Sequence, residues 1–125
     1  MTARDFDFWV GTWDAEWEGG RGTNVVTAEL DGAVILERFD GRPGNELRGI
    51  SVSVHDGEQW RQTWVDNQQG HIDLRGGMAA GEMVLHSGEH RMRFTEIGPE
   101  SFVWLWERRR GAAWDVRWRI DYRRA

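Results

Sequence analysis

Polar side chains that could bind or react with a ligand occur in the strand-like segment 59–67. Two-residue alternation along this segment places Trp60, Gln62, Trp64 and Asp66 on one face. Two tryptophans on a face favour the protein interior, so Gln62 and Asp66 would follow them inward, where an unpaired carboxylate is costly. We therefore interpret Asp66 either as a polar anchor at the mouth of a pocket or as a strand-end carboxylate satisfied by the amides of the following turn.

A second acid, Glu37, follows the apolar run 34–36 and must find a partner if it is buried. One interpretation is a structural ion pair with an arginine of a neighbouring strand, such as Arg48. The other is a desolvated carboxyl with a raised pKa, which is the profile of a general acid or base. If the protein is an enzyme, which the sequence leaves open, the catalytic candidates are Glu37 and Asp66, with His71 as a secondary candidate.

The residue types present exclude several other chemistries. The chain has no cysteine, and all 16 of its basic residues are arginine, so thiolate catalysis, cysteine-bound zinc and lysine Schiff bases are impossible. His86 and His90 have metal-ligand spacing, but a Ser-Gly turn separates them instead of a helix. We expect neither a metal nor a cofactor; a metal held by this histidine pair and a haem group are the minor alternatives.

The composition also limits the classes of partner that the protein could bind. A net charge of −5 argues against a general nucleic-acid-binding protein, although seven arginines lie within 108–124. Apolar runs of four or five residues are too short to cross a membrane, and no signal peptide is evident, so we expect a soluble, cytoplasmic protein. The nine tryptophans must either fill a core or line a cavity.

The secondary-structure pattern predicts an all-β fold. Alternating segments separated by Gly, Asp, Asn and Pro turns recur about every ten residues, which is typical of an antiparallel meander. We predict a single domain over 1–125 that closes into a barrel, with a two-sheet sandwich as the alternative. One helical turn within 3–10 would let Phe6, Phe8 and Trp9 close an end of the barrel. The ten predicted strands are 12–19, 22–30, 33–40, 46–56, 59–67, 70–76, 81–87, 89–96, 100–108 and 113–124.

The last of these segments also shows a regular alternation. Trp114, Val116, Trp118, Ile120 and Tyr122 share one side, while charged residues occupy the other. We predict that the apolar set faces the interior.

Three motifs in order resemble a bacterial lipocalin-like, or calycin-type, family of unknown function. They are the Phe-x-Phe-x-x-Gly-x-Trp start at 6–13, the Trp-x-Gln-x-Trp-x-Asp-Asn-Gln run at 60–68, and Trp118 with Tyr122 followed by Arg123 or Arg124. The resemblance implies a barrel in which Trp13 lies at one end beneath an arginine of the last strand. The candidates for that arginine are Arg117, Arg119 and Arg123.

Three functions remain open at this point. The first is a barrel that binds a small apolar or aromatic molecule, with no nucleic-acid or membrane partner and a homodimer as the default assembly. The second is a cofactor-independent cyclase, isomerase or decarboxylase that uses an interior carboxylate. The third is a solid structural barrel, which an interior volume above about 300 Å³ would disfavour. The residues predicted to bind a ligand are Trp17, Trp60, Gln62, Trp64, Asp66, Trp104, Trp106 and Trp118, with Glu37 as a further polar contact.

Overall fold

The computed structural model describes residues 3–125 of the chain, and this part confirms the all-β prediction. One 3-10 turn, η1 (Asp7–Trp9), precedes ten antiparallel strands. The strands are β1 (Gly11–Trp17), β2 (Gly20–Glu29), β3 (Val34–Asp40), β4 (Arg48–His55), β5 (Trp60–Asp66), β6 (His71–Ala79), β7 (Glu82–Ser87), β8 (His90–Thr95), β9 (Ser101–Arg110) and β10 (Ala113–Arg124).

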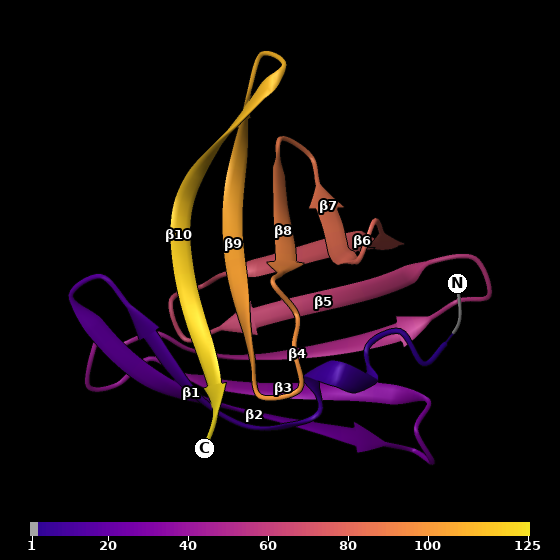
Figure 1. Ribbon diagram of the computed structural model, residues 1–125, viewed down its shortest axis with the longest axis horizontal. Helices are drawn as coiled ribbons and strands as arrows, with labels where there is room; N and C mark the ends of the chain where they lie inside the picture. The colour runs from indigo at the N-terminus through magenta and orange to yellow at the C-terminus, as the bar shows by residue number, and fades with distance from the viewer. Residues whose placement is uncertain (1–2) are drawn as a thin grey trace.

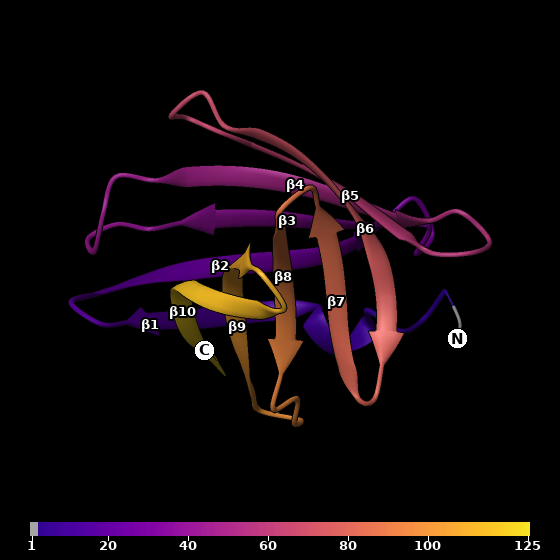
Figure 2. The same ribbon diagram turned by 90° about the horizontal axis from the view of Figure 1, so that it is seen from above.

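The strands form a closed meander barrel. Each strand pairs with the next in the chain, and β10 returns to pair with β1, so that Trp13 lies opposite Arg124 and Glu16 opposite Asp121. In Figure 1 the strands β1–β5 run across the view while β8–β10 run nearly upright, so the two halves of the wall cross each other. Figure 2 shows the same arrangement from above, with η1 beneath β7 and β8. Closure leaves no free sheet edge along the seam, as expected for a stable small barrel.

Tight turns produce this order because they force consecutive strands to be neighbours. Gly19 and Gly57 have φ of +86° and +100°, a left-handed backbone that L side chains rarely adopt, in the turns after β1 and after β4. The alternation predicted from the sequence then assigns most side chains to the correct face; in β1, for example, Trp13 and Ala15 are buried while Asp14 and Glu16 are exposed.

Aromatic side chains fill one end of the barrel, and η1 covers it. We call this the closed end: Phe6, Trp9, Trp13, Trp60 and Phe94, each at most 2% exposed. The Phe6 ring meets the Trp60 and Phe94 rings edge-on at 5.1 and 5.2 Å between centroids. The Trp13 indole donates a hydrogen bond of 2.8 Å to the Trp9 carbonyl oxygen. The prediction that the N-terminal aromatic residues close an end of the barrel is confirmed.

The arginine over Trp13 is Arg124, and the three arginines predicted for this contact were wrong. Its guanidinium carbon lies 4.3 Å from the Trp13 ring centroid. Its nitrogens also donate to the carbonyl oxygens of Phe8, Val10 and Pro99 at 2.8 to 3.2 Å. Arg124 has the same strand phase as the inward-facing Tyr122, whereas Arg117, Arg119 and Arg123 are exposed on the outer surface.

A second correction concerns the first half of β10. The pairing with β9 shifts between Val116 and Trp118, which marks a β-bulge. The extra residue reverses the inside-outside phase, so Trp118, Ile120 and Tyr122 face inward as predicted, but Trp114 and Val116 do not. Trp114 lies on the outer surface under the guanidinium of Arg91, 4.1 Å from its ring centroid, and Val116 is 54% exposed.

Within residues 3–125 there is no helix long and apolar enough to cross a membrane.

Candidate functional site

A cavity of about 200 Å³ occupies the barrel interior beside the closed end and opens at the opposite end. Trp9 and Phe94 form its floor, and Leu47 and Asp66 lie at its mouth, where β5 ends. We call the part of the interior farthest from η1 the open end. It consists of Phe39, Trp64, Trp104, Trp106 and Trp118. The full lining is Trp9, Glu37, Phe39, Leu47, Gln62, Trp64, Asp66, Ile72, Leu74, Met92, Phe94, Trp104, Trp106, Trp118, Ile120 and Tyr122.

The structure brings six of the eight residues predicted to bind a ligand to this cavity. They are Gln62, Trp64, Asp66, Trp104, Trp106 and Trp118. The Trp104 and Trp118 rings are 5.7 Å apart and perpendicular, at 90°, while Trp104 and Trp106 are parallel within 7°. Trp104 and Trp118 therefore pack edge against face in the cavity wall.

The two remaining tryptophans occupy other places. Trp60 is 2% exposed and belongs to the closed end, where it contacts Phe6 and His55. Trp17 packs behind the cavity wall, edge-on to Trp118 at 5.3 Å, and Gly44 lies against its ring. Alternation identified both as inward-facing, but it carries no information on which inward-facing ring borders empty space.

Glu37 lies in the cavity wall on β3 and has no basic partner among the residues that the structure describes. Its Oε1 accepts a hydrogen bond of 2.7 Å from the Ser51 hydroxyl, and its Oε2 accepts one of 2.9 Å from the Asn24 amide. The predicted ion pair with Arg48 is therefore wrong, because Arg48 is exposed on the outer surface opposite Asp40. Burial raises the pKa of Glu37, and the two hydrogen bonds only partly oppose this effect.

Other buried polar groups accompany Glu37 across β2, β4, β5 and β10. Gln62 donates from its Nε2 to the Ser53 hydroxyl at 2.9 Å, while its Oε1 has no hydrogen-bond partner among residues 3–125. The indole N–H of Trp9, on the floor, also has none. The pKa of Tyr122 is well above its ordinary value, because of burial and the nearby Glu37 carboxyl, against a hydrogen bond with Asn24. Buried polar atoms without a partner are uncommon, and two further ones, on Asn24 and Trp60, belong to residues outside the cavity lining.

Asp66 is the strand-end carboxylate that one of the two sequence interpretations described. Its oxygens accept hydrogen bonds from the amides of Gln68 and Gly70 and from the Trp64 indole, all at 2.8 to 2.9 Å. Burial raises the pKa of Asp66, but these three bonds outweigh it and hold the pKa below its ordinary value. Asp66 thus fixes the orientation of Trp64, whose ring also lies so close to Gly49 that a Cβ atom there would collide with it.

The histidines do not contribute to a common site. His71 is exposed and pairs with the outward-facing Val65, so the structure does not place this catalytic candidate at the cavity. His86 lies on the outer surface near Trp114, whereas His90 stacks on the inward-facing Trp106 at 5.1 Å, so the two cannot ligate one metal. Among residues 3–125, no group of three His, Asp or Glu side chains could hold a metal ion.

Several lining residues were missed by the sequence analysis. Phe39 shares its strand face with Glu37 and could have been found by continuing that alternation. Met92, Leu74 and Ile72 are ordinary apolar strand residues, and their place beside the cavity depends on barrel curvature, for which the sequence has no local signal.

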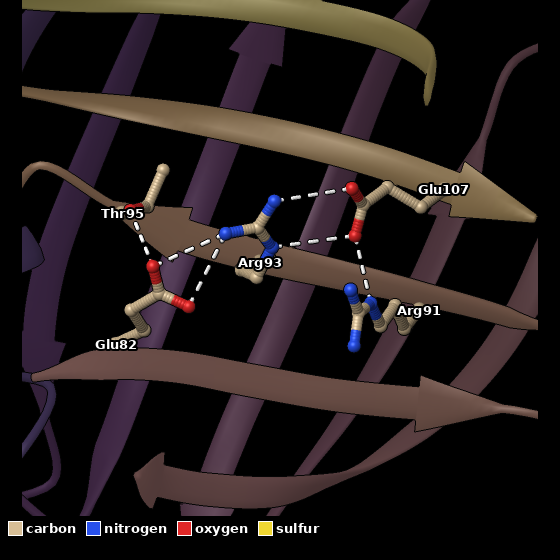
Figure 3. Close-up of polar contacts among 5 residues, drawn as sticks. All are labelled: Glu82, Arg91, Arg93, Thr95 and Glu107. Atoms are coloured by element: carbon tan, nitrogen blue, oxygen red, sulfur yellow. Dashed lines mark hydrogen bonds and ion pairs between the residues drawn. The ribbon is translucent and has the colours of Figure 1, made fainter. Parts of the chain in front are cut away.

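A second polar cluster lies on the outer face of β7–β9 and was also not predicted. Figure 3 shows Arg93 between Glu82 and Glu107, with Arg91 on the other side of Glu107. Glu107 is only 2% exposed and pairs with Arg91 at 2.7 Å and with Arg93 at 3.2 Å. Burial raises the pKa of Glu107, but the two arginines outweigh it and lower the pKa. Because both carboxylates in this network, Glu82 and Glu107, are paired with arginines, the network offers no free reactive group.

No known protein family model matches the chain, and no curated protein sequence is similar to it.

Proposed function

We propose that this chain is a lipocalin-like barrel that binds a small, largely apolar or aromatic molecule. The observation that carries the proposal is the cavity of about 200 Å³, which has five indoles in its lining and a buried carboxyl, Glu37, facing it. Binding cavities commonly combine apolar walls with a few polar groups that fix the orientation of the ligand. The order of the three sequence motifs, from the start of β1 to the end of β10, supports a lipocalin-like architecture.

The volume limits the size of the ligand. It lies below the value of about 300 Å³ that would disfavour a solid structural barrel, so that third interpretation of the sequence still stands beside binding. An apolar cavity of about 150 Å³ is nevertheless sufficient for benzene. We therefore propose a ligand with one ring, or two fused rings, instead of a long acyl chain or a tetrapyrrole.

Native mass spectrometry of the protein purified from its own host tests this proposal. Ile72→Trp should fill the cavity from its wall, while Val52→Trp adds the same ring to the outer surface, where Val52 is 43% exposed. We expect a retained small molecule on the wild type and on Val52→Trp, and none on Ile72→Trp. A bare wild-type protein that also fails to bind neutral aromatic probes in solution would contradict the proposal.

A second candidate function is proton-transfer catalysis with Glu37 as acid or base. The observation that favours it is the upward shift of the Glu37 pKa beside a cavity. Acetophenone is a suitable probe, because a base that removes its α-proton and returns a solvent deuteron exchanges the methyl group. In D₂O, exchange measured by NMR should be faster with the wild type than with Glu37→Gln. Equal rates would leave binding as the function of the cavity.

A further inference from the structure

The carboxyl groups that line the cavity have no basic counterpart in the lining among residues 3–125. The lining contains two carboxyl groups, Glu37 and Asp66, and no arginine or histidine among the described residues. A ligand carboxylate or phosphate would therefore meet no cation at all. The cavity disfavours anions and leaves neutral molecules and cations as candidates.

Glu37 distinguishes between these two classes. Both of its oxygens accept hydrogen bonds from neutral donors, Ser51 and Asn24, and it forms no ion pair within residues 3–125. A buried carboxylate without a countercharge is costly, and a cation brought by the ligand removes that cost. The Gln62 Oε1, which also belongs to a buried lining residue, is a second acceptor and has no hydrogen-bond partner in the described part of the chain. A ligand nitrogen with several N–H groups would suit this pair of acceptors.

The aromatic wall favours the same charge. Phe39 and Trp104 each meet Trp118 edge against face, at 89° and 90° between the ring planes, and all three rings line the cavity. The faces of indole rings carry negative electrostatic potential and attract ammonium groups, most strongly where water is excluded. Acid and aromatic groups therefore act together on one cation.

We propose that the cavity binds a small organic cation, a primary or secondary ammonium on a body of about one aromatic ring, with its nitrogen on Glu37 and its body against the indoles of the open end. This inference rests on the proposed binding function and specifies its ligand class. The cavity of about 200 Å³ accommodates an arylalkylamine of this size.

Isothermal titration calorimetry with three probes of nearly equal shape tests the inference on the full chain at neutral pH and low salt. The probes are benzylamine, benzyl alcohol and benzoate. We expect benzylamine to bind about tenfold more tightly than benzyl alcohol, the factor for about 1.4 kcal/mol from one desolvated charge interaction, and benzoate not to bind.

Three variants assign the effect to a residue. Glu37→Gln should reduce benzylamine affinity to that of benzyl alcohol and leave benzyl alcohol unchanged. Glu16→Gln removes the same charge from the exposed face of β1 and should change neither affinity. Asp66→Asn should have the smaller effect of the two cavity acids, because Asp66 is partly exposed at the mouth, where solvent and salt screen its charge, whereas Glu37 is buried.

The outcomes separate the two proposals. Equal binding of benzylamine and benzyl alcohol, or an unchanged benzylamine affinity in Glu37→Gln, overturns the cation inference and leaves the binding function in place. Failure of all three probes to bind overturns both. If Glu37→Gln does not fold, the ranking of the three probes on the wild type still decides the ligand class.

Discussion

Trp13 and Trp118 lie at opposite ends of the same barrel interior, and the protein covers them to different extents. Trp13 is fully buried, with Arg124 over its ring and the Trp9 carbonyl on its indole nitrogen. Trp118 is half-buried and borders the cavity. Strand alternation turns both tryptophans inward. At the end that η1 covers, the indole fills the interior. At the other end, which no described residue covers, the indole lines a cavity. The following predictions test this division.

The largest expected effect separates the two tryptophans themselves. Trp13→Ala should lower the free energy of unfolding by about 3–5 kcal/mol, because it removes a fully buried ring and leaves a cavity. Trp118→Ala should cost about 1–2 kcal/mol, because part of that ring is already in contact with solvent. Urea unfolding of both variants measures the difference. Equal losses would mean that the two ends do not differ in packing.

Arg124 holds the closed end together, and its loss should be the next largest effect. Arg124→Ala removes the three hydrogen bonds to backbone carbonyls and the contact with Trp13, and we expect a loss of about 2 kcal/mol. Arg123→Ala, one residue away on the exposed face, is the matched control and should change stability by less than about 0.5 kcal/mol. Similar losses for the two variants would argue against a specific role for Arg124.

A smaller effect is expected at the mouth of the cavity. Asp66→Asn should lower stability by about 1 kcal/mol, because it weakens the hydrogen bonds from Trp64 and the turn amides. Since the folded-state pKa lies below the ordinary value of 3.8, this contribution is present above that value and is lost as the pH falls through the folded-state pKa. Unfolding measured between neutral and acidic pH should therefore show a shallower decline in the variant. An identical decline would place the acid sensitivity elsewhere.

The smallest effect on stability, and the opposite pH dependence, belongs to Glu37. Because its folded-state pKa is raised above 4.5, the stability that it contributes is fully present below that value and is lost as the pH rises through the folded-state pKa. Glu37→Gln removes this dependence and should change stability at neutral pH by less than about 1 kcal/mol. Thermal unfolding of the wild type and of Glu37→Gln, measured from below pH 4.5 to neutral pH, provides the comparison. A variant as pH-dependent as the wild type would show that Glu37 does not titrate there.

The sequence was sufficient for the strand order because turns and alternation are local signals. The glycines after β1 and β4 mark chain reversals in the sequence itself, and the ten strands lie within a few residues of their predicted bounds. Trp114 was misplaced because the bulge before Trp118 depends on how β10 curves against β9, not on any residue pattern.

The candidate site was only partly predictable for a similar reason. Alternation identified Trp60 and Trp64 as inward-facing, but only the packing of Phe6 against Trp60 assigns one to the core and the other to the cavity. Glu37 was recognised as a buried acid, yet its partners, Asn24 and Ser51, come from two other strands and are common polar residues. Contacts of this kind depend on how the strands pair, and no sequence motif around Asn24 or Ser51 marks either residue as a partner of Glu37.

The seam between β1 and β10 bears on the order in which the chain folds. Every other strand pairing within residues 3–125 joins strands that are consecutive in sequence, whereas this one joins residues 11–17 to residues 113–124. Pairing strands that are distant in sequence loses loop-closure entropy before any contact between them forms. We therefore expect the seam to form late and to limit the folding rate. During synthesis, β1–β9 therefore form an open sheet with two unpaired edges until β10 has emerged. That interval is when the chain is most exposed to aggregation and most dependent on chaperones.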